Sequence, residues 1–348
     1  MTDRKIDIHI LATKLNRPAI DRRWMARPRL ISSLDRSPDK RVTLISAPAG
    51  YGKTTLVVQW LDQITATPIW LSLDQYDNEP DRFIRYIIAG VRRHFPEFGI
   101  RTESLLASPT LPPPNYLADT LVSDLVALKK PLVIAIDDFH TTASEPVQAV
   151  LARMIQYLPD NVHLVIATRV DPPLPLAQWR VRKWLAEIRV AVLRFFPEEA
   201  RAYFGFALAG QLSDDAIERI VTRTEGWVAG LQLARLSLAD TDDPEALARR
   251  FSGNDRMVVE FFMDEVISRQ PDEIKHFFTA TSMLDRFCTS LCDYLLADEG
   301  CTRDSRRLIN LLEKENLFLV PLDRDGAWYR YHHLFQELLS CRMKAALP

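Results

Sequence analysis

The sequence predicts an α/β fold with a parallel sheet, followed by a mostly helical second part. In the first half, short aliphatic runs without polar alternation recur between longer amphipathic segments, as expected for strands buried on both faces of a sheet. After about residue 196, helical patterns with acidic or Ser/Asp starts follow one another, and the next aliphatic run comes only at 317. A chain of 348 residues is long enough for two or three domains.

Five aliphatic runs are the expected strands of the first part. Helical patterns separate them, which predicts right-handed crossovers and helices on both faces of the sheet. The proline-rich stretch ASPTLPPPNY, at 107–116, is expected to be an exposed loop between two helices, because proline interrupts helices. The five runs are VTLISA (42–47), IWLSL (69–73), LVIAID (132–137), HLVIAT (163–168) and the weaker IRVAVLRF (188–195).

The second part ends in a pattern typical of a winged helix. Three helical stretches, beginning at Pro197, Ser213 and Pro271, precede LFLVPL, an Asp-Gly turn, AWYRYHHLF and a last helix. The two short runs around the Asp-Gly turn predict a hairpin. The resulting division is an α/β domain at 1–195, a small helical domain at 196–255 and a winged-helix domain at 256–348.

Composition restricts the class of partner. The chain has 47% hydrophobic and 26% charged residues, close to globular averages, and 44 Lys and Arg against 46 Asp and Glu. No global basic field attracts nucleic acid or anionic lipid, so any such binding is expected to be local. No apolar run approaches the roughly 18 residues of a membrane span, and the polar N-terminus does not read as a signal peptide.

The cysteines fit a reducing compartment. We expect buried free thiols at Cys288 and Cys292, because no CxxC pair or matching histidine spacing completes a zinc site around them. Cys301 and Cys341 are the remaining two, and all four lie in the last quarter of the chain. Together with the absence of a signal peptide, this predicts a cytoplasmic protein without a membrane partner.

The first predicted strand leads into a phosphate-binding loop. Residues 47–54 read APAGYGKT, which matches the P-loop pattern G-x-x-x-x-G-K-[ST] except that Ala47 replaces the first glycine. Gly50 and Gly52 allow the backbone to turn tightly and direct N–H groups at phosphate oxygens, and the following helix adds its positive end. The predicted nucleotide contacts in this stretch are Ala49, Gly50, Tyr51, Gly52, Lys53, Thr54 and Thr55.

Each side chain that opens the following helix has an expected role. Lys53 reaches the β- and γ-phosphates, Thr54 ligates Mg²⁺, and Thr55 reaches the α-phosphate. The alternative is a glycine turn with a solvent-facing lysine. The aliphatic strand before the loop and the amphipathic helix after it favour the phosphate site.

Two later strands end in the charged groups that such a site needs. Asp137 ends LVIAID and suits the metal, while Asp138, the next residue, is placed to polarise an attacking water. The alternative for this pair is a strand end that caps the next element. Arg169 follows the next strand and is expected to contact the γ-phosphate, since guanidinium binds phosphate as a fixed fork; a surface salt bridge is the alternative.

These motifs resemble one known family. TKLNRP, RPRL at 27–30, APAGYGKTT, WLSLD, IDDFH, ATRVDPPLPLAQWR, EGWVAGLQLA, LFLVPLD and YRYHHLFQELL occur in order over nearly the whole chain. They are similar to the N-terminal module of MalT-like ATPases, the large LuxR-type bacterial transcription activators in the STAND class of signalling NTPases. Members of that family usually carry alanine at the first P-loop glycine, so Ala47 is consistent with the resemblance.

The resemblance implies a P-loop NTPase domain of the ASCE type, in which the strand that ends before Arg169 lies beside the P-loop strand. It implies base contacts from Arg27. It also implies that His332, with His333 as second choice, contacts the β-phosphate in a closed ADP state. Gly226 and Trp227 would form an edge over the nucleotide. Read without the family, the two histidines are core or surface residues of a wing, and Gly226–Trp227 belongs to a packed helix.

We therefore expect a signalling ATPase that binds ATP or ADP with Mg²⁺. ADP would keep the domains closed; ATP would free them for self-association and transcription activation, and slow hydrolysis would reset the switch. Members of the family continue into a helical-repeat sensor and a LuxR-type helix-turn-helix that are absent from this chain. We therefore expect a shortened form of a longer protein, with inducer and DNA bound by the missing regions; a short homologue is the alternative. A conventional P-loop ATPase or kinase is the alternative, and a DNA-binding winged helix is a second one.

Overall fold

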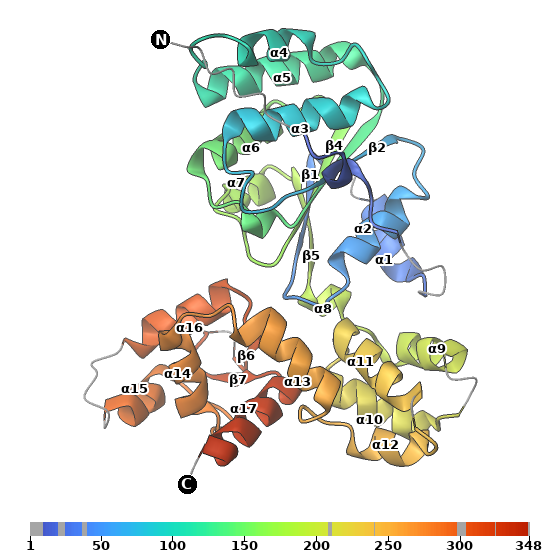
Figure 1. Ribbon diagram of the computed structural model, residues 1–348, viewed down its shortest axis with the longest axis vertical. Helices are drawn as coiled ribbons and strands as arrows, with labels where there is room; N and C mark the ends of the chain where they lie inside the picture. The colour runs from blue at the N-terminus through green and yellow to red at the C-terminus, as the bar shows by residue number, and fades with distance from the viewer. Residues whose placement is uncertain are drawn as a thin grey trace. The chain divides into compact units, whose positions relative to one another are not determined.

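The computed structural model describes residues 10–19, 25–36, 40–207, 211–239, 241–297, 304–323 and 325–346. The chain forms two compact units (Figure 1). The first comprises Met1–Ser46 and Lys53–Arg189, and the second comprises Ala47–Gly52 and Val190–Pro348. The chain therefore passes between the units on both sides of the predicted phosphate loop and again after the last strand of the sheet.

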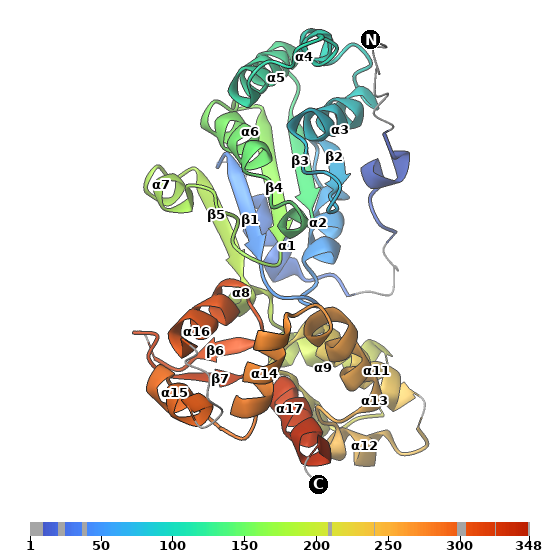
Figure 2. The same cartoon turned by 60° about the vertical axis from the view of Figure 1, so that its left-hand side comes forward.

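The first unit is built on a five-stranded sheet in the order β2-β3-β4-β1-β5, with every pair parallel. The predicted α/β class is confirmed. The strands lie side by side in Figure 2, and every residue of β1, β3 and β4 is buried, which explains their continuous aliphatic sequences. The strands are β1 (Val42–Ser46), β2 (Thr67–Ser72), β3 (Leu132–Asp137), β4 (Val162–Thr168) and β5 (Leu185–Arg189).

Helices connect these strands. Three helices, α3, α4 and α5, lie between β2 and β3. Helix α5 packs against α4 and also against α6, which follows β3 (Figure 1). The core of the unit consists of buried aliphatic and aromatic side chains from the strands and from α3, α5 and α6. The helices are η1 (Ala12–Leu15), α1 (Pro28–Asp35), α2 (Lys53–Leu61), α3 (Pro80–Arg92), α4 (Ile100–Leu106), α5 (Pro114–Leu128), η2 (Phe139–Thr141), α6 (Glu145–Gln156) and α7 (Leu176–Val181).

Two element predictions are wrong at their boundaries. The fifth strand was expected at 188–195 but occupies Leu185–Arg189, and the following residues form a short helix, because pairing with β1 ends where Ser46 meets Arg189. The loop expected at 107–116 ends early, since α5 already begins at Pro114. A proline in the first helical turn lacks only an N–H that would have had no partner within the helix.

The second unit is helical except for one hairpin. Strands β6 (Leu319–Pro321) and β7 (Tyr329–Tyr331) pair antiparallel, as predicted, and Gly326 between them has a left-handed φ of 62°. The helices are α8 (Val190–Leu193), α9 (Pro197–Ala207), α10 (Asp214–Thr224), α11 (Val228–Ala239), α12 (Pro244–Arg250), α13 (Arg256–Phe262), the π-helical turn η3 (Met263–Ile267), α14 (Asp272–Thr281), α15 (Thr289–Ala297), α16 (Ser305–Lys314) and α17 (His333–Ala346).

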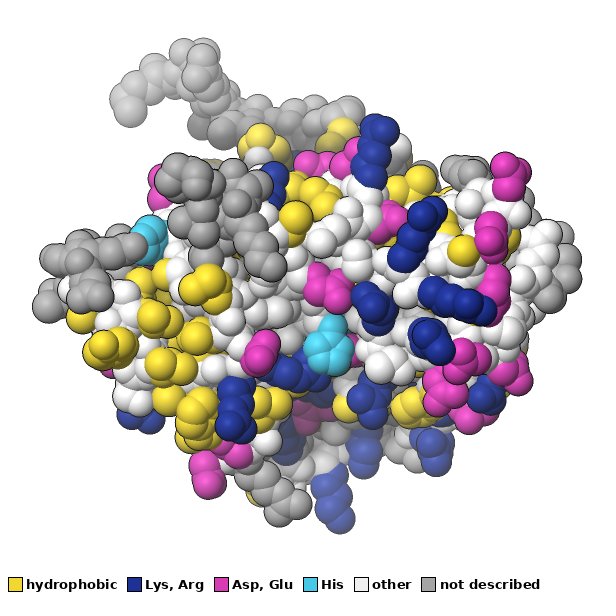
Figure 3. All heavy atoms as spheres, turned by 90° about the horizontal axis from the view of Figure 1, so that it is seen from below, with side chains coloured by type: hydrophobic (Ala, Val, Ile, Leu, Met, Phe, Trp, Pro, Cys, Tyr) yellow, Lys and Arg dark blue, Asp and Glu magenta, His cyan; other side chains and the backbone are white. Residues whose placement is uncertain are grey.

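The surface carries charges of both signs. Figure 3 shows one face of the molecule, on which Lys and Arg side chains are interspersed with Asp and Glu. Across the described ranges, no helix is both long and apolar enough to span a membrane. Of the cysteines within those ranges, Cys292 is a buried free thiol, Cys288 is only half-buried and Cys341 is exposed; Cys301 lies outside them. Expecting Cys288 to be buried was therefore wrong.

Candidate nucleotide-binding site

Lys53 opens α2 in the first unit and is almost completely buried, with 8% of its surface exposed. Burial lowers the pKa of its ammonium group to about 8, and the nearby Arg169 acts in the same direction, while Asp137 and Asp138 partly oppose it. Burial and Arg169 therefore disfavour the charged form of Lys53 more than the two carboxylates favour it. An anion such as a phosphate would stabilise it.

Thr54 and Asp137 lie together, although 83 positions separate them in the chain. The Thr54 hydroxyl donates a 2.8 Å hydrogen bond to Asp137 Oδ2. The other carboxylate oxygen, Oδ1, is buried without a hydrogen-bond partner in the described part of the chain. Burial, and then the nearby Asp138, raise the pKa of Asp137 to about 6. Two oxygen donors, one of them a buried carboxylate with a free lone pair, fit a hard cation such as Mg²⁺.

The other two charged candidates follow β3 and β4. Asp138 has a left-handed φ of 54°, and its half-exposed side chain lies 3.9 Å from His140 Nδ1. Arg169 follows β4, which pairs with the P-loop strand β1, so the strand arrangement implied by the family is present. Asp138 and Arg169 both act electrostatically on Lys53. The roles predicted for them in water activation and γ-phosphate binding stay predictions.

Residues 47–52 of the phosphate loop pack within the second unit. Gly50 and Gly52 have left-handed φ angles of 77° and 74°, which L side chains rarely adopt. The carbonyl of Ala49 accepts a 3.0 Å hydrogen bond from Trp227 Nε1, and the carbonyl of Gly50 accepts a 2.8 Å bond from the Ala229 backbone N–H. Tyr51 is buried, and burial together with Glu225 raises the pKa of its phenol.

The two candidate histidines differ sharply. His332 is buried, and its Nε2 lies 2.9 Å from the Thr224 carbonyl oxygen, which can only accept, so Nε2 carries the proton. Burial lowers the pKa of His332 to about 4, and the neutral ring leaves Nδ1 as an acceptor without a partner in the described residues. His333 is half-exposed at its side chain, and its backbone N–H donates to Glu225. A phosphate contact from His332 therefore requires the ring to leave Thr224 or gain a proton.

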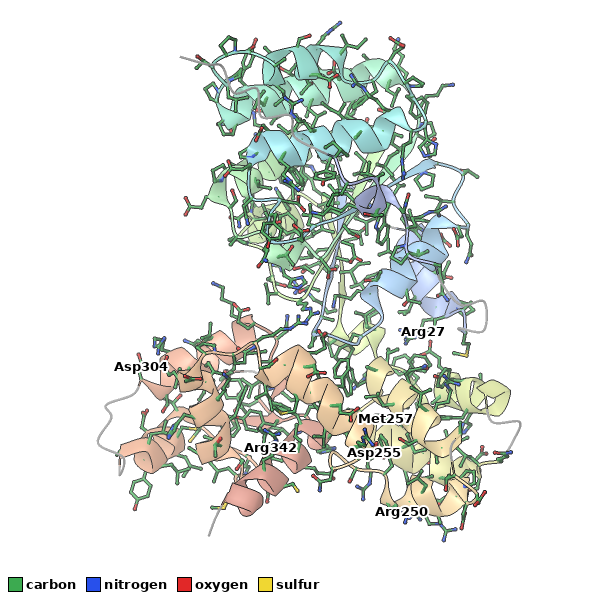
Figure 4. The ribbon with its side chains drawn as sticks, viewed as in Figure 1. Arg27, Arg250, Asp255, Met257, Asp304 and Arg342 are labelled. Atoms are coloured by element: carbon green, nitrogen blue, oxygen red, sulfur yellow. The ribbon has the colours of Figure 1, made fainter. Side chains whose placement is uncertain are left out.

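The remaining candidates lie at helix starts. Arg27 precedes α1, where Figure 4 labels it, and is 7% exposed; its carbonyl accepts hydrogen bonds from the backbone N–H groups of Leu30 and Ile31. Thr55 is half-buried in the first turn of α2. The base contact expected of Arg27 and the phosphate contact expected of Thr55 stay predictions.

Sequence reasoning missed an ion-pair network at the ends of β1 and β5. Ser46 donates a 2.7 Å hydrogen bond to Asp171, two residues after Arg169. Arg189, which ends β5, forms salt bridges with Asp171 and, at 2.6 Å, with Glu187. The alternation of charge in the LAEIR stretch was the only signal for it in the sequence.

A glycine-containing loop between β1 and α2, a carboxylate at the end of β3 and an arginine after β4 define the class: a P-loop NTPase fold, here followed by helices and a hairpin. A solved structure agrees on the fold. The Walker-type ATPase of Pyrococcus abyssi aligns with 90% of this chain and 95% of its own at a TM-score of 0.64 and 14% identity.

Sequence comparison gives the narrower relationship. Residues 263–348 match the MalT winged helix domain. The transcriptional regulator MalT of Serratia proteamaculans is 30% identical over 342 residues, and that of Cronobacter sakazakii is 31% identical over 335. These alignments cover 97% and 96% of this chain but only 37% of each relative. The resemblance seen in the sequence is confirmed: the chain is a MalT-like module that spans little more than a third of these regulators' length.

Proposed function

We propose that this chain is the nucleotide-dependent switch of a MalT-like transcription regulator, a STAND-class ATPase. ADP keeps it in a closed resting form, ATP releases it for self-association and transcription activation, and slow hydrolysis to ADP resets it. Inducer and DNA bind regions of the regulator outside this chain. The observation that carries the proposal is the hydrogen bond from Thr54 to the buried Asp137 beside the phosphate loop, with the other carboxylate oxygen lacking a partner among the described residues.

Residues of the first unit bind the metal ion and the nucleotide and carry out hydrolysis. Thr54 and Asp137 hold Mg²⁺, which neutralises charge on the phosphates when bound. Lys53 binds the β- and γ-phosphates and Thr55 the α-phosphate, while Arg27 contacts the base. Asp138 accepts a proton from the attacking water, and Arg169 stabilises charge that develops on the γ-phosphate.

The switch requires different affinities in its two states. Moving an equilibrium from 1:99 to 99:1 takes about 5.5 kcal/mol of differential binding. Contacts from the second unit are suited to supply part of it. The loop residues 49–52 provide backbone N–H groups, and His332 provides a closed-state contact to the β-phosphate. The buried Nδ1 of His332 has no hydrogen-bond partner in the described part of the chain, which supports a role beyond packing.

The decisive experiment measures nucleotide content, turnover and affinity on the same purified protein. We expect ADP to remain bound through purification and turnover well below the rate of about 1 s⁻¹ or more typical of kinases. His332→Ala should weaken ADP more than ATP, whereas His94→Ala, at an exposed position of the first unit, should change neither. Equal losses for both nucleotides would exclude the closed-state role of His332.

A conventional P-loop ATPase or kinase is the competing function. Rapid turnover without inducer, together with an empty site after purification, would favour it over the switch. Asp138→Asn separates the chemical step from binding, since it should retain ATP while slowing hydrolysis. Asp160→Asn, in the turn before β4, is a matched carboxylate control.

DNA binding by the winged helix itself has less support. Two of its arginines are already paired: Arg330 makes a bidentate salt bridge to Glu225, and Arg307 pairs with Glu273. Basic side chains are interspersed with acidic ones on the face in Figure 3. A salt-dependent shift of duplex DNA by this chain would nevertheless establish that second function.

A further inference from the structure

Within the second unit, the side chain of Trp227 contacts the phosphate loop. It is fully buried just before α11, and its indole N–H donates to the Ala49 carbonyl at 3.0 Å. Two residues on, the Ala229 backbone N–H donates to the Gly50 carbonyl at 2.8 Å. Consecutive carbonyls of the loop are therefore held by one short segment.

These two bonds also orient the donors of the loop. In a trans peptide unit the C=O and the following N–H point in opposite directions. Holding the carbonyl of Ala49 therefore directs the N–H of Gly50 away from Trp227, and holding that of Gly50 does the same for the N–H of Tyr51. Such N–H groups are the phosphate ligands of a P-loop, so the segment at 227–229 orients them before a nucleotide arrives.

The close approach depends on a glycine. A Cβ atom on Gly50 would lie 2.6 Å from Ala229 Cβ and 2.8 Å from Trp227 Nε1, closer than non-bonded atoms allow. Gly50 thus meets two demands, its left-handed φ and the contact with Trp227. The second demand is invisible in the P-loop pattern, which specifies neither a glycine at that position nor a tryptophan elsewhere.

The indole also packs against elements of the winged helix. Its centroid lies 5.0 Å from that of Phe262 in a stacked arrangement, and 5.4 Å and 5.9 Å from those of Phe318 and His332, which it meets edge to face. Phe262 ends α13, whose first turn is fixed by Asp255: this carboxylate accepts from the Met257 N–H at 3.1 Å (Figure 4). A change of packing at Phe318 or His332 must therefore move the indole.

We infer that Trp227 is a positioning residue that couples nucleotide affinity at the phosphate loop to the packing of the winged helix. The inference rests on the proposed function and names its regulation. Ordered packing around the indole keeps the Ala49 carbonyl fixed and the loop N–H groups aimed at phosphate. Disordered packing releases the loop and weakens binding, and by linkage a bound nucleotide stabilises the winged-helix contacts by the same factor.

The test uses Trp227→Phe, which keeps an aromatic ring in the cluster and removes the N–H donor together with part of the indole; the control below accounts for the lost volume. We expect the Kd for ADP to rise about tenfold, the loss of one hydrogen bond. Trp179→Phe, at a buried tryptophan of the first unit, is the matched control and should leave the Kd nearly unchanged. Equal effects of the two variants would overturn the inference while leaving a nucleotide switch intact.

Phe318→Leu tests the coupling, because it alters the packing of the indole without touching the loop. It should weaken ADP binding about threefold in the wild-type background and have no further effect in Trp227→Phe. Additive effects in the double variant would contradict the coupling.

Amide hydrogen exchange provides a readout that does not depend on nucleotide. In Trp227→Phe, exchange should accelerate in a peptide containing residues 50 and 51 while α14 and α17 keep their protection. Acceleration throughout the second unit would show a merely structural role. Failure of wild type to bind any nucleotide would instead overturn the proposed function, and the exchange result would still decide whether Trp227 positions the loop.

Discussion

Two acidic side chains, Asp137 in the first unit and Glu225 in the second, lie in opposite electrostatic environments. In the first unit, Lys53 has its pKa lowered to about 8 and Asp137 has its pKa raised to about 6, so both charged forms are poorly stabilised by their surroundings. In the second unit, Glu225 accepts two hydrogen bonds from Arg330, at 2.7 and 2.8 Å, and its pKa falls to about 2 despite partial burial. Asp137 keeps one buried carboxylate oxygen without a hydrogen-bond partner among the described residues, whereas both carboxylate oxygens of Glu225 accept from Arg330.

Removal of the buried lysine that opens α2 has the largest expected effect. Lys53→Ala should lower nucleotide affinity by a factor of about 100 or more, because a buried charge-assisted contact to phosphate is lost. Lys130→Ala, at an exposed lysine of the same unit, is the matched control. Titration calorimetry with ADP and ATP gives both constants, and unchanged affinity in Lys53→Ala would refute the phosphate role of this residue.

Lowering the pH should reduce the free energy of unfolding through His332 in the second unit. Its pKa of about 4 lies below the unfolded value of about 6.5, so between these pH values the unfolded chain holds a proton that the folded one does not. The free energy of unfolding should therefore fall by about 2–3 kcal/mol as pH drops from 6.5 to 4. Glu225 and Arg330, together with His333, face this group and contribute to its shift.

The measurement is denaturant unfolding across that pH range. His332→Gln keeps a donor for the Thr224 carbonyl and should flatten the slope between pH 6.5 and 4, whereas His333→Gln, with its side chain half-exposed, should not. Glu225 loses its stabilising charge only at lower pH, between its unfolded pKa near 4.5 and about 2, so the two contributions separate. An unchanged slope in His332→Gln would contradict the buried neutral ring.

Asp137→Asn should stabilise the metal-free protein, which is the opposite of its expected effect on binding. Because the pKa of Asp137 is raised, its protonated carboxyl group contributes stability below pH 3.8. This contribution is lost as pH rises through about 6. Asparagine removes that charge and still accepts from the Thr54 hydroxyl, so the free energy of unfolding at pH 7 should rise by about 1–2 kcal/mol. Nucleotide affinity in the presence of Mg²⁺ should fall.

Denaturant unfolding in a chelating buffer measures the expected rise in stability. Comparing unfolding with and without nucleotide measures the expected loss of affinity. Asp160→Asn is the control, because its side chain is exposed in the turn before β4 and should change stability by less than about 0.5 kcal/mol. A destabilised Asp137→Asn would indicate that the carboxylate is satisfied by the protein, and the contrast between the units would then fail.

The sequence predicted features that local patterns encode, and it missed contacts between residues that lie far apart in the chain. Strands β1, β3 and β4 were predictable, because burial on both faces makes every position aliphatic. The positions of Thr54 and Asp137 were predictable too, since Thr54 follows the phosphate-loop motif into α2 and Asp137 ends β3. The bond from Trp227 to Ala49 spans 178 positions, and no local pattern encodes it. The same holds for His332 and Thr224, whose contact is set by tertiary packing.

The edge strand β5 was misplaced for a physical reason that also yields the smallest prediction. Its polar residues are paired rather than solvated: Glu187 bonds Arg180 and Arg189, and its pKa falls to about 2. Arg189→Gln should remove one partner of Glu187 and one partner of Asp171, which keeps its bond from Ser46. Both ends of these pairs are partly exposed, so we expect a loss of less than about 1 kcal/mol at pH 7.

The pH dependence of the stability loss in Arg189→Gln makes even this small effect measurable. Glu187 contributes stability above its unfolded pKa of 4.5, and that contribution is lost as pH falls toward 2. Arg189→Gln should therefore be less stable than wild type at pH 7 and approach it at pH 3. Arg182→Gln, at an exposed arginine between α7 and β5, is the control. A deficit that persists undiminished at pH 3 would mean that Arg189 acts through packing, and the network would then be no more than part of the sheet edge.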